Sequence, residues 1–276
     1  MHDHHHIRGP VVSGLFYPAD PKVLDREVAA LLHQHRATAI HGRLTAMISP
    51  HAGYMYSGHT AGAAFACIEG EPYDSVVVLS PSHREYFDGV SVYPGEAYQT
   101  PLGTIPIDGD LRHRILESCP FVRATEAGHR EEHAVEVQLP FLQRTIGTFT
   151  LLPLVFGDQK RSYCLELGQR LGTLVAGTRT LLVASTDLSH YHAAPEAERL
   201  DRVFLEDVRT GNFDRLMTDL ERGATEACGG GPVVAILAAV QTLGGGPMKI
   251  LERRTSGDVT GDQGSVVGYC SAVAYA

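Results

Sequence analysis

The chain has 276 residues, 43% of them hydrophobic and 20% charged, which is typical of a globular protein with one large domain or two small ones. Its formal net charge of -9, with no basic stripe, argues against a nucleic-acid-binding protein. No apolar run is long enough to cross a bilayer, so we expect no membrane association.

Residues 1–10 are rich in histidine and lack the apolar segment of a signal peptide, so we expect a disordered tail followed by one domain over residues 11–276. We do not expect the histidines of this tail to form part of a metal site. The five cysteines are scattered and lack CxxC spacing, which favours the reducing cytoplasm over a disulfide framework. They are Cys67, Cys119, Cys164, Cys228 and Cys270.

The predicted elements alternate between helical periodicity and short apolar runs. In chain order, a capped amphipathic helix (20–33) precedes a strand (44–49), a helix (58–68), a strand (75–80), a helix (132–146), a strand (150–156), a helix (161–175), a strand (180–185), two helices (196–210 and 232–243) and two final strands (248–255 and 265–275). Near-continuous apolar strands indicate a sheet buried on both faces. We therefore predict an α/β fold, a three-layer α/β/α single domain with a mostly parallel or mixed central sheet.

Histidines follow three of the predicted strands. Each of His51, His83 and His190 lies in the loop that leaves one of these strands. Ligands of open α/β sheets bind at the carboxyl ends of strands, so neighbouring strands would bring the three imidazoles to one pocket. Proline precedes the first of these histidines and stiffens its loop. A histidine taken alone would be an ordinary surface residue, but three at equivalent strand ends predict a shared site.

Cys228 precedes three glycines and Pro232, which suits the first turn of the following helix. The positive end of a helix dipole favours a thiolate, which can act as a metal ligand or a nucleophile. The alternative is an inert buried cysteine, which we expect for the other four.

A competing motif is H-x-x-E-H, formed by His129, Glu132 and His133, which matches a zinc-hydrolase pattern. Zinc binding would need both histidines on one face of a helix, with Glu132 as general base. Helical periodicity begins near Glu132, which would leave His129 outside the helix. His133 would then line the pocket of the strand-end histidines instead.

These segments together resemble the MEMO family, whose prokaryotic members are called AmmeMemoRadiSam system protein B. The resemblance rests on motifs in the same order along nearly the whole chain. They are GLFYP at 14–18, SPHAGY at 49–54, SPSH at 80–83, EEHAVE at 131–136, STDLSH at 185–190, Cys228-Gly229 with Pro232, and the last strand.

The resemblance implies a fold similar to class III extradiol (LigB-type) dioxygenases and an iron or copper site. Its ligands would be His51, His83 and Cys228, with Asp187 and His190 beside them as the catalytic pair. The dioxygenases use a carboxylate where this chain offers a thiolate, and a softer ligand favours copper(I) or a redox-active iron(II) centre, with zinc as a further option.

The resemblance also bears on the ligand pocket. His133, Tyr54 and Phe16 are the expected pocket residues, and Phe16 stands where eukaryotic members have a tryptophan linked to phosphopeptide binding. The three glycines replace bulkier, basic residues of other members, which argues against recognition of an anionic ligand.

Three functions follow as hypotheses. The first is a metal-dependent redox protein in which His190 acts as acid or base, tuned by Asp187. The second is a non-catalytic module that binds a small molecule, a peptide or a protein; in the prokaryotic family the expected partners are a radical SAM enzyme and the companion A protein. The third is zinc hydrolysis at the H-x-x-E-H motif.

Overall fold

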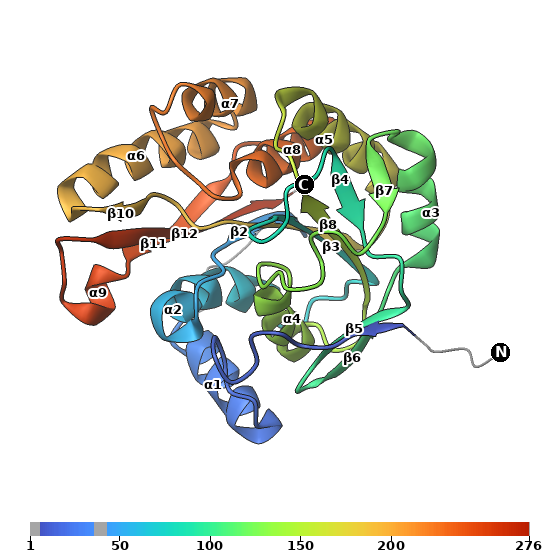
Figure 1. Ribbon diagram of the computed structural model, residues 1–276, viewed down its shortest axis with the longest axis horizontal. Helices are drawn as coiled ribbons and strands as arrows, with labels where there is room; N and C mark the ends of the chain where they lie inside the picture. Colours follow the sequence, from blue (N-terminus) through green and yellow to red (C-terminus); the bar gives the residue numbers. More distant parts are fainter. Residues whose placement is uncertain (1–5, 36–42, 276) are drawn as a thin grey trace.

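The computed structural model describes residues 6–35 and 43–275 (Figure 1). The strands are β1 (Ile7–Arg8), β2 (Leu44–Ser49), β3 (Ser75–Pro81), β4 (Val90–Val92), β5 (Ala97–Thr100), β6 (Gly103–Pro106), β7 (Val122–Ala124), β8 (Thr150–Phe156), β9 (Thr180–Ser185), β10 (His190–His192), β11 (Lys249–Thr255) and β12 (Val266–Tyr275). The α-helices are α1 (Pro21–His33), α2 (Tyr54–Phe65), α3 (Gly109–Ser118), α4 (Leu139–Thr145), α5 (Arg161–Val175), α6 (Ala194–Thr210), α7 (Phe213–Glu221), α8 (Gly230–Thr242) and α9 (Gly257–Thr260), with short 3₁₀ helices at Ala66–Ile68 and Glu136–Gln138.

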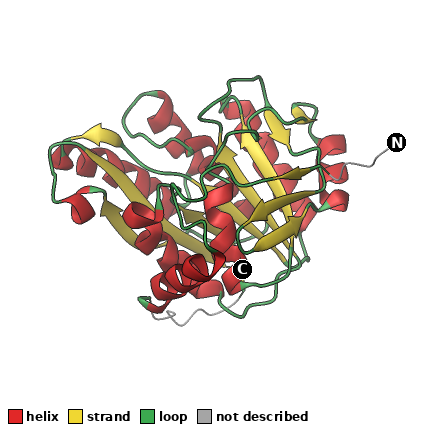
Figure 2. Ribbon diagram, turned by 60° about the horizontal axis from the view of Figure 1, so that its bottom comes forward, coloured by secondary structure: helices red, strands yellow, loops and turns green. Residues whose placement is uncertain are grey.

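A mixed sheet forms the middle layer (Figure 2). Its strands run in the order β10-β12-β2-β9-β3-β8-β4-β7, and β11 pairs with β12. The contiguous strands β2, β9, β3 and β8 are parallel, whereas β12 and β4 join this block antiparallel on either side. The predicted α/β fold with a mostly parallel or mixed sheet is therefore confirmed.

The central strands are apolar throughout because helices cover both faces of the sheet. Every residue of β2, β3 and β9 is buried. One core packs α3, α5, α6, α7 and α8 against the sheet. The other packs α1, α2, α4 and the small sheet β1-β5-β6 against its opposite face (Figure 1). The predicted three layers are present, with an added small sheet.

Residues 6–10, which the sequence placed in the predicted tail of residues 1–10, form part of the domain. β1 pairs with β5, and the buried Arg8 guanidinium forms an ion pair with the buried Glu136 carboxylate. Glu136 also accepts hydrogen bonds from Val11 N (2.9 Å) and Tyr17 Oη (2.6 Å). A buried charge needs such partners, and they fix this segment to the domain. His2, His4 and His5 lie outside the described residues.

The predicted helix over 132–146 is mostly wrong, because the α-helix begins only at Leu139. Glu132 instead turns its carboxylate back onto the backbone, where it accepts hydrogen bonds from His133 N and Ala134 N, both at 2.9 Å. Such local side-chain bonds compete with helix formation. Across residues 6–35 and 43–275, no helix is both long and apolar enough to span a bilayer.

Candidate metal centre

The carboxyl ends of β2, β9 and β3 lie side by side, because these strands are parallel neighbours. His51 follows β2, His83 follows β3, and the loop after β9 leads to His190. All three imidazoles line one cavity of about 430 Å³. The convergence predicted from the strand ends is therefore confirmed, at the edge of the sheet where ligands of α/β proteins bind.

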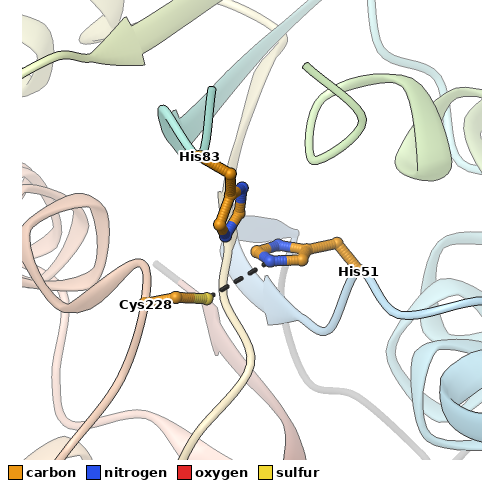
Figure 3. Close-up of side chains that lie close together, drawn as sticks. All are labelled: His51, His83 and Cys228. Atoms are coloured by element: carbon orange, nitrogen blue, oxygen red, sulfur yellow. Dashed lines mark hydrogen bonds between the residues drawn. The ribbon is translucent and has the colours of Figure 1, made fainter. Parts of the chain in front are cut away.

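Cys228 completes a group with His51 and His83 whose ligand atoms all lie within 4.8 Å of one another. Its Sγ is 3.2 Å from His51 Nε2, and Figure 3 shows the two rings and the sulfur turned toward one another. The three residues come from distant parts of the chain, so the fold, not local sequence, assembles them. Two imidazoles and a sulfur at this spacing could hold one metal ion.

The tautomer of His51 follows from its hydrogen bonds. Its Nδ1 lies 2.9 Å from Ser185 Oγ, whose single proton goes to Ala134 O at 2.7 Å. Ser185 Oγ also accepts from Gln138 Nε2 at 2.8 Å, so it can only accept from His51 as well. His51 Nδ1 therefore carries the ring proton, and Nε2 presents a lone pair toward Cys228.

His83 is held in the same way by a carboxylate. Its Nδ1 bonds Glu132 Oε1 at 2.9 Å, which leaves Nε2 as its ligand nitrogen. Burial raises the pKa of Glu132, but the hydrogen bond and charge of His83 and the charge of His133 outweigh burial and lower this pKa to about 2. A carboxylate behind a ligand histidine is a common way to orient the ring and raise its basicity.

The thiol of Cys228 is not the free thiolate that its position before α8 predicts. Burial, followed by the nearby Asp187, raises the pKa of Cys228. Sγ accepts a hydrogen bond from Asp187 N at 3.2 Å. This bond favours the thiolate, but its effect on the pKa of Cys228 is smaller than that of burial. The sulfur therefore becomes an anionic ligand only when a cation replaces its proton.

Gly229 lets the Cys228 loop reach the end of β9. A Cβ at this position would lie 2.3 Å from Ser185 O and 2.8 Å from Thr186 Cβ, so no larger residue fits without a backbone shift. Gly229 N also donates to Thr186 Oγ1 at 2.9 Å. This close backbone approach sets how deep the sulfur lies.

Asp187 holds His51 in place through a backbone hydrogen bond. Its Oδ1 accepts a hydrogen bond from His51 N at 2.8 Å, and burial raises its pKa. His190 lies in β10 and lines the same cavity as the two other histidines. No hydrogen bond joins Asp187 to His190 among the described residues, but the charge of His190 acts to lower the pKa of Asp187 and both residues border the cavity, so the tuning of one by the other stays a prediction.

The predicted pocket residues Phe16 and His133 line the cavity, and their rings lie 4.9 Å apart. Tyr54 does not, which corrects that prediction. It is 3% exposed, donates its hydroxyl to Val137 O at 2.8 Å and packs against Phe141. Its place is taken by Tyr56, because a helix turns residues two apart to different faces.

Sequence reasoning missed three further aromatic residues of the cavity, which have no motif of their own. They are Tyr56, Tyr191 and Tyr269. Tyr191 has a φ of 63°, a conformation that is strained for a bulky residue, and its side chain is 77% exposed. A second cavity of about 440 Å³, between α7 and α8, also reaches His190 and Cys228.

Comparisons with known proteins show the family of this chain. A family model described as Memo-like protein matches residues 8–273. The chain belongs to the MEMO family. MEMO1 family protein MJ0403 of Methanocaldococcus jannaschii is 34% identical over 97% of this chain and 98% of its own length. A MEMO1 family protein of Aquifex aeolicus is 35% identical over the same shares.

A solved structure, titled as that of the uncharacterized protein JW3007 from Escherichia coli K12, has a related fold. It covers 84% of this chain and 99% of its own, with a TM-score of 0.53 and 17% sequence identity. At this identity the likeness concerns the fold alone, and the MEMO assignment rests on the sequence relatives.

The H-x-x-E-H motif of this MEMO family member is not a zinc-hydrolase site. His129 is completely buried, with Nδ1 2.6 Å from Tyr98 Oη and Nε2 3.1 Å from Ser91 Oγ. No metal-capable group within the described ranges includes it. The motif does not lie on a helix, so the one-turn spacing of its histidines is lost.

Glu132 and His133 form an alternative metal-capable group with His83. This group shares His83 with the first, so one ion would choose between them. Glu132 Oε1 already accepts hydrogen bonds from three N–H groups, of His83, His133 and Ala134. An ion there would have to displace them, whereas Nε2 of His51 and of His83 need no such change. The group with Cys228 is therefore better prepared.

Proposed function

We propose that this MEMO family member is a metal-dependent oxidoreductase of the non-heme iron or copper class. The ion would bind His51, His83 and Cys228. One observation carries the proposal: two ring nitrogens and a sulfur from three separate segments face each other within 4.8 Å beside a cavity. Imidazole nitrogens and cysteine sulfur are both established ligands of transition-metal ions.

The donor set favours iron(II) or copper(I). A sulfur beside two imidazoles suits these ions, and three protein ligands leave a coordination position open. Bound there, either ion would supply one-electron chemistry with oxygen or an organic substrate. Zinc fits the same donors, but it would make the centre redox-inactive.

The protein's own part is to bind and orient the substrate and to move protons. His190 borders the cavity from β10 and is the residue proposed as acid or base. Asp187 holds the backbone of His51 and so positions a ligand. Phe16, Tyr56 and Tyr269 give the cavity an aromatic wall, which favours a small organic substrate with an apolar part.

Metal analysis and oxygen uptake test this proposal. The protein is purified without a histidine tag, with His2, His4, His5 and His6 replaced by alanine. We expect about one iron or copper ion per chain, and oxygen uptake with a reductant that His83→Ala abolishes. Cys67→Ser is the matched control, because Cys67 is a partly buried thiol outside the cavity. Equal, stoichiometric metal in the starting protein and in Cys228→Ser would refute the assignment.

A binding module is the second candidate, favoured by the exposed apolar rim of the cavity. Leu15 and Tyr191 line it and are 80% and 77% exposed. Such residues suit a peptide or protein ligand, and a radical SAM enzyme and the companion A protein are the partners proposed in this case. A pull-down of these partners that survives His51→Ala and is lost on Leu15→Ser would favour this function.

A further inference from the structure

A third metal-capable group lies apart from the cavity. It consists of His35, which follows α1, His59 on α2 and Glu252 on β11. α1 and β11 both pack against α2, so three elements that are distant in sequence meet here (Figure 1). None of the three residues lines the cavity of the first site. The proposed redox function makes no use of them.

The spacing of these side chains matches a small coordination shell. Their ligand atoms lie within 4.8 Å of one another. His59 Nδ1 is 3.0 Å from the Glu252 carboxylate, and His35 Nε2 is 3.8 Å from it. Tetrahedral zinc with bonds of about 2.0–2.1 Å places its ligand atoms about 3.3 Å apart. Only small side-chain shifts would close the shell.

The second observation is an unpartnered nitrogen. His35 Nε2 is buried and has no hydrogen-bond partner among the described residues. The His35 side chain is 16% exposed and that of Glu252 is 17% exposed. Buried polar atoms normally have a partner, and those that lack one call for an explanation such as an ion. The two imidazole rings also meet edge to face, with centroids 4.4 Å apart.

We propose that His35, His59 and Glu252 bind zinc(II), with the fourth position left to water. Two imidazoles and a carboxylate are a common donor set for zinc with an open position. The ion would join the end of α1 to α2 and β11, and its effect would be on the stability of this corner of the domain.

Arg254 determines what must move when zinc binds. Its Nε donates to Glu252 Oε1 at 2.7 Å, and one terminal nitrogen lies 3.4 Å from His59 Nε2. In the metal-free protein His59 Nδ1 donates its proton to the Glu252 carboxylate. Zinc would bind Nδ1, so the ring proton would have to move to Nε2. The guanidinium must then turn outward, which its 38% exposure allows. Arg254 thus occupies part of the site as a competing cation in the metal-free protein.

The test isolates this group from the other histidines. The full-length background protein carries His83→Ala and Cys228→Ser, which disable both groups at the first site, and alanine at residues 2, 4, 5 and 6. After treatment with a chelator, zinc chloride is added and binding is followed by calorimetry. We expect one zinc ion per chain and a rise in melting temperature with zinc.

Variants in the same background protein show which residues bind zinc. Glu252→Gln keeps the size of the side chain, and we expect it to weaken zinc binding at least about tenfold. His59→Asn gives an independent test with a polar side chain, and circular dichroism checks that both variants fold. His33→Ala is the matched control, since His33 is exposed at the end of the same helix and should leave affinity unchanged.

Two results would overturn the proposal: no zinc bound by the folded background protein, or equal affinity in that protein and in both ligand variants. Arg254→Gln should tighten zinc binding because the competing charge is gone, and weaker binding in this variant would also contradict the proposed geometry. Because the first site is absent from every sample, none of these outcomes depends on the proposed redox function.

Discussion

The two histidine groups differ in what stands behind the rings. At the strand ends, His51 and His83 are each held through Nδ1, by Ser185 and Glu132, and both keep Nε2 for an ion. At the helix surface, His59 is held by Glu252, which is itself a prospective ligand. The first group is therefore organised before an ion arrives, and the second must break a hydrogen bond to accept one.

Burial separates the two groups less than this support does. His51 is 2% exposed, but the side chains of His83 and His59 are 29% and 28% exposed. Ligands that are already fixed in place lose little freedom on binding. We therefore expect the strand-end group to bind metal more tightly, and the following changes test the support behind its rings.

The largest effect is expected from removing the sulfur. Cys228→Ser replaces a soft donor by a hard hydroxyl that does not ionise at neutral pH, so affinity for copper(I) should fall by at least about a hundredfold. Competition with a copper(I) chelator measures the change. Cys67→Ser should match the unaltered protein, and a similar loss in that variant would show that the effect is not specific to Cys228.

Removing the carboxylate behind His83 should come next. Glu132→Gln leaves a neutral side chain that supports the ring more weakly, and we expect metal affinity to fall about 10–100-fold. The neighbouring Glu131 is exposed, so Glu131→Gln is the control in the same titration. An unchanged affinity in Glu132→Gln would mean that His83 needs no such support.

The same carboxylate should govern the acid sensitivity of the metal-free protein. The pKa of Glu132 falls from an ordinary 4.5 to about 2 in the folded state. The unfolded chain therefore takes up this proton first as the pH drops, and the stabilisation present above pH ~4.5 is lost toward pH ~2. We expect the ionised Glu132 to account for roughly 3 kcal/mol of the stability that is lost in acid.

Urea unfolding at several pH values measures the acid loss. The difference in unfolding free energy between the unaltered protein and Glu132→Gln should shrink as the pH falls through this window. A difference that stays constant with pH would argue against an ionised Glu132 in the folded state.

The smallest effect on metal affinity is expected from a change that no longer fixes the tautomer of His51. Ser185→Ala removes the acceptor of its Nδ1 proton, so the ring is no longer fixed with Nε2 free, and affinity should fall about tenfold. Ser189→Ala is the control, because Ser189 is a buried serine in the loop that follows β9, and its hydroxyl has no hydrogen-bond partner in the described chain. Equal losses in both variants would point to packing and not to the tautomer.

The sequence predicted the strand-end group because local features carry it. Apolar runs give β2, β3 and β9, and the polar residues at their ends then follow from parallel pairing. Cys228 was found from its place before a helix. The prediction that Cys228 is a thiolate was wrong, because the burial and the nearby Asp187 that raise its pKa arise only in the tertiary fold.

Two of the failures come from long-range contacts made by polar side chains. The ion pair of Arg8 with Glu136 joins residues 128 positions apart and fixes a segment that the sequence predicted as part of a tail. Glu132 does not start the expected helix, because its carboxylate binds the ring of His83 as well as its own backbone. Partners so distant in sequence leave no local pattern. The exchange of Tyr54 and Tyr56 has a different cause: the helix starts four residues earlier than its periodicity suggests.

The most direct measurement of the central claim is anomalous diffraction from crystals loaded with iron(II) or copper(I). The account predicts one ion at the strand ends, bonded to Cys228 Sγ and to Nε2 of both His51 and His83, with Glu132 still bonded to His83 Nδ1. An ion held by His83, Glu132 and His133 with the sulfur outside its coordination shell would contradict it.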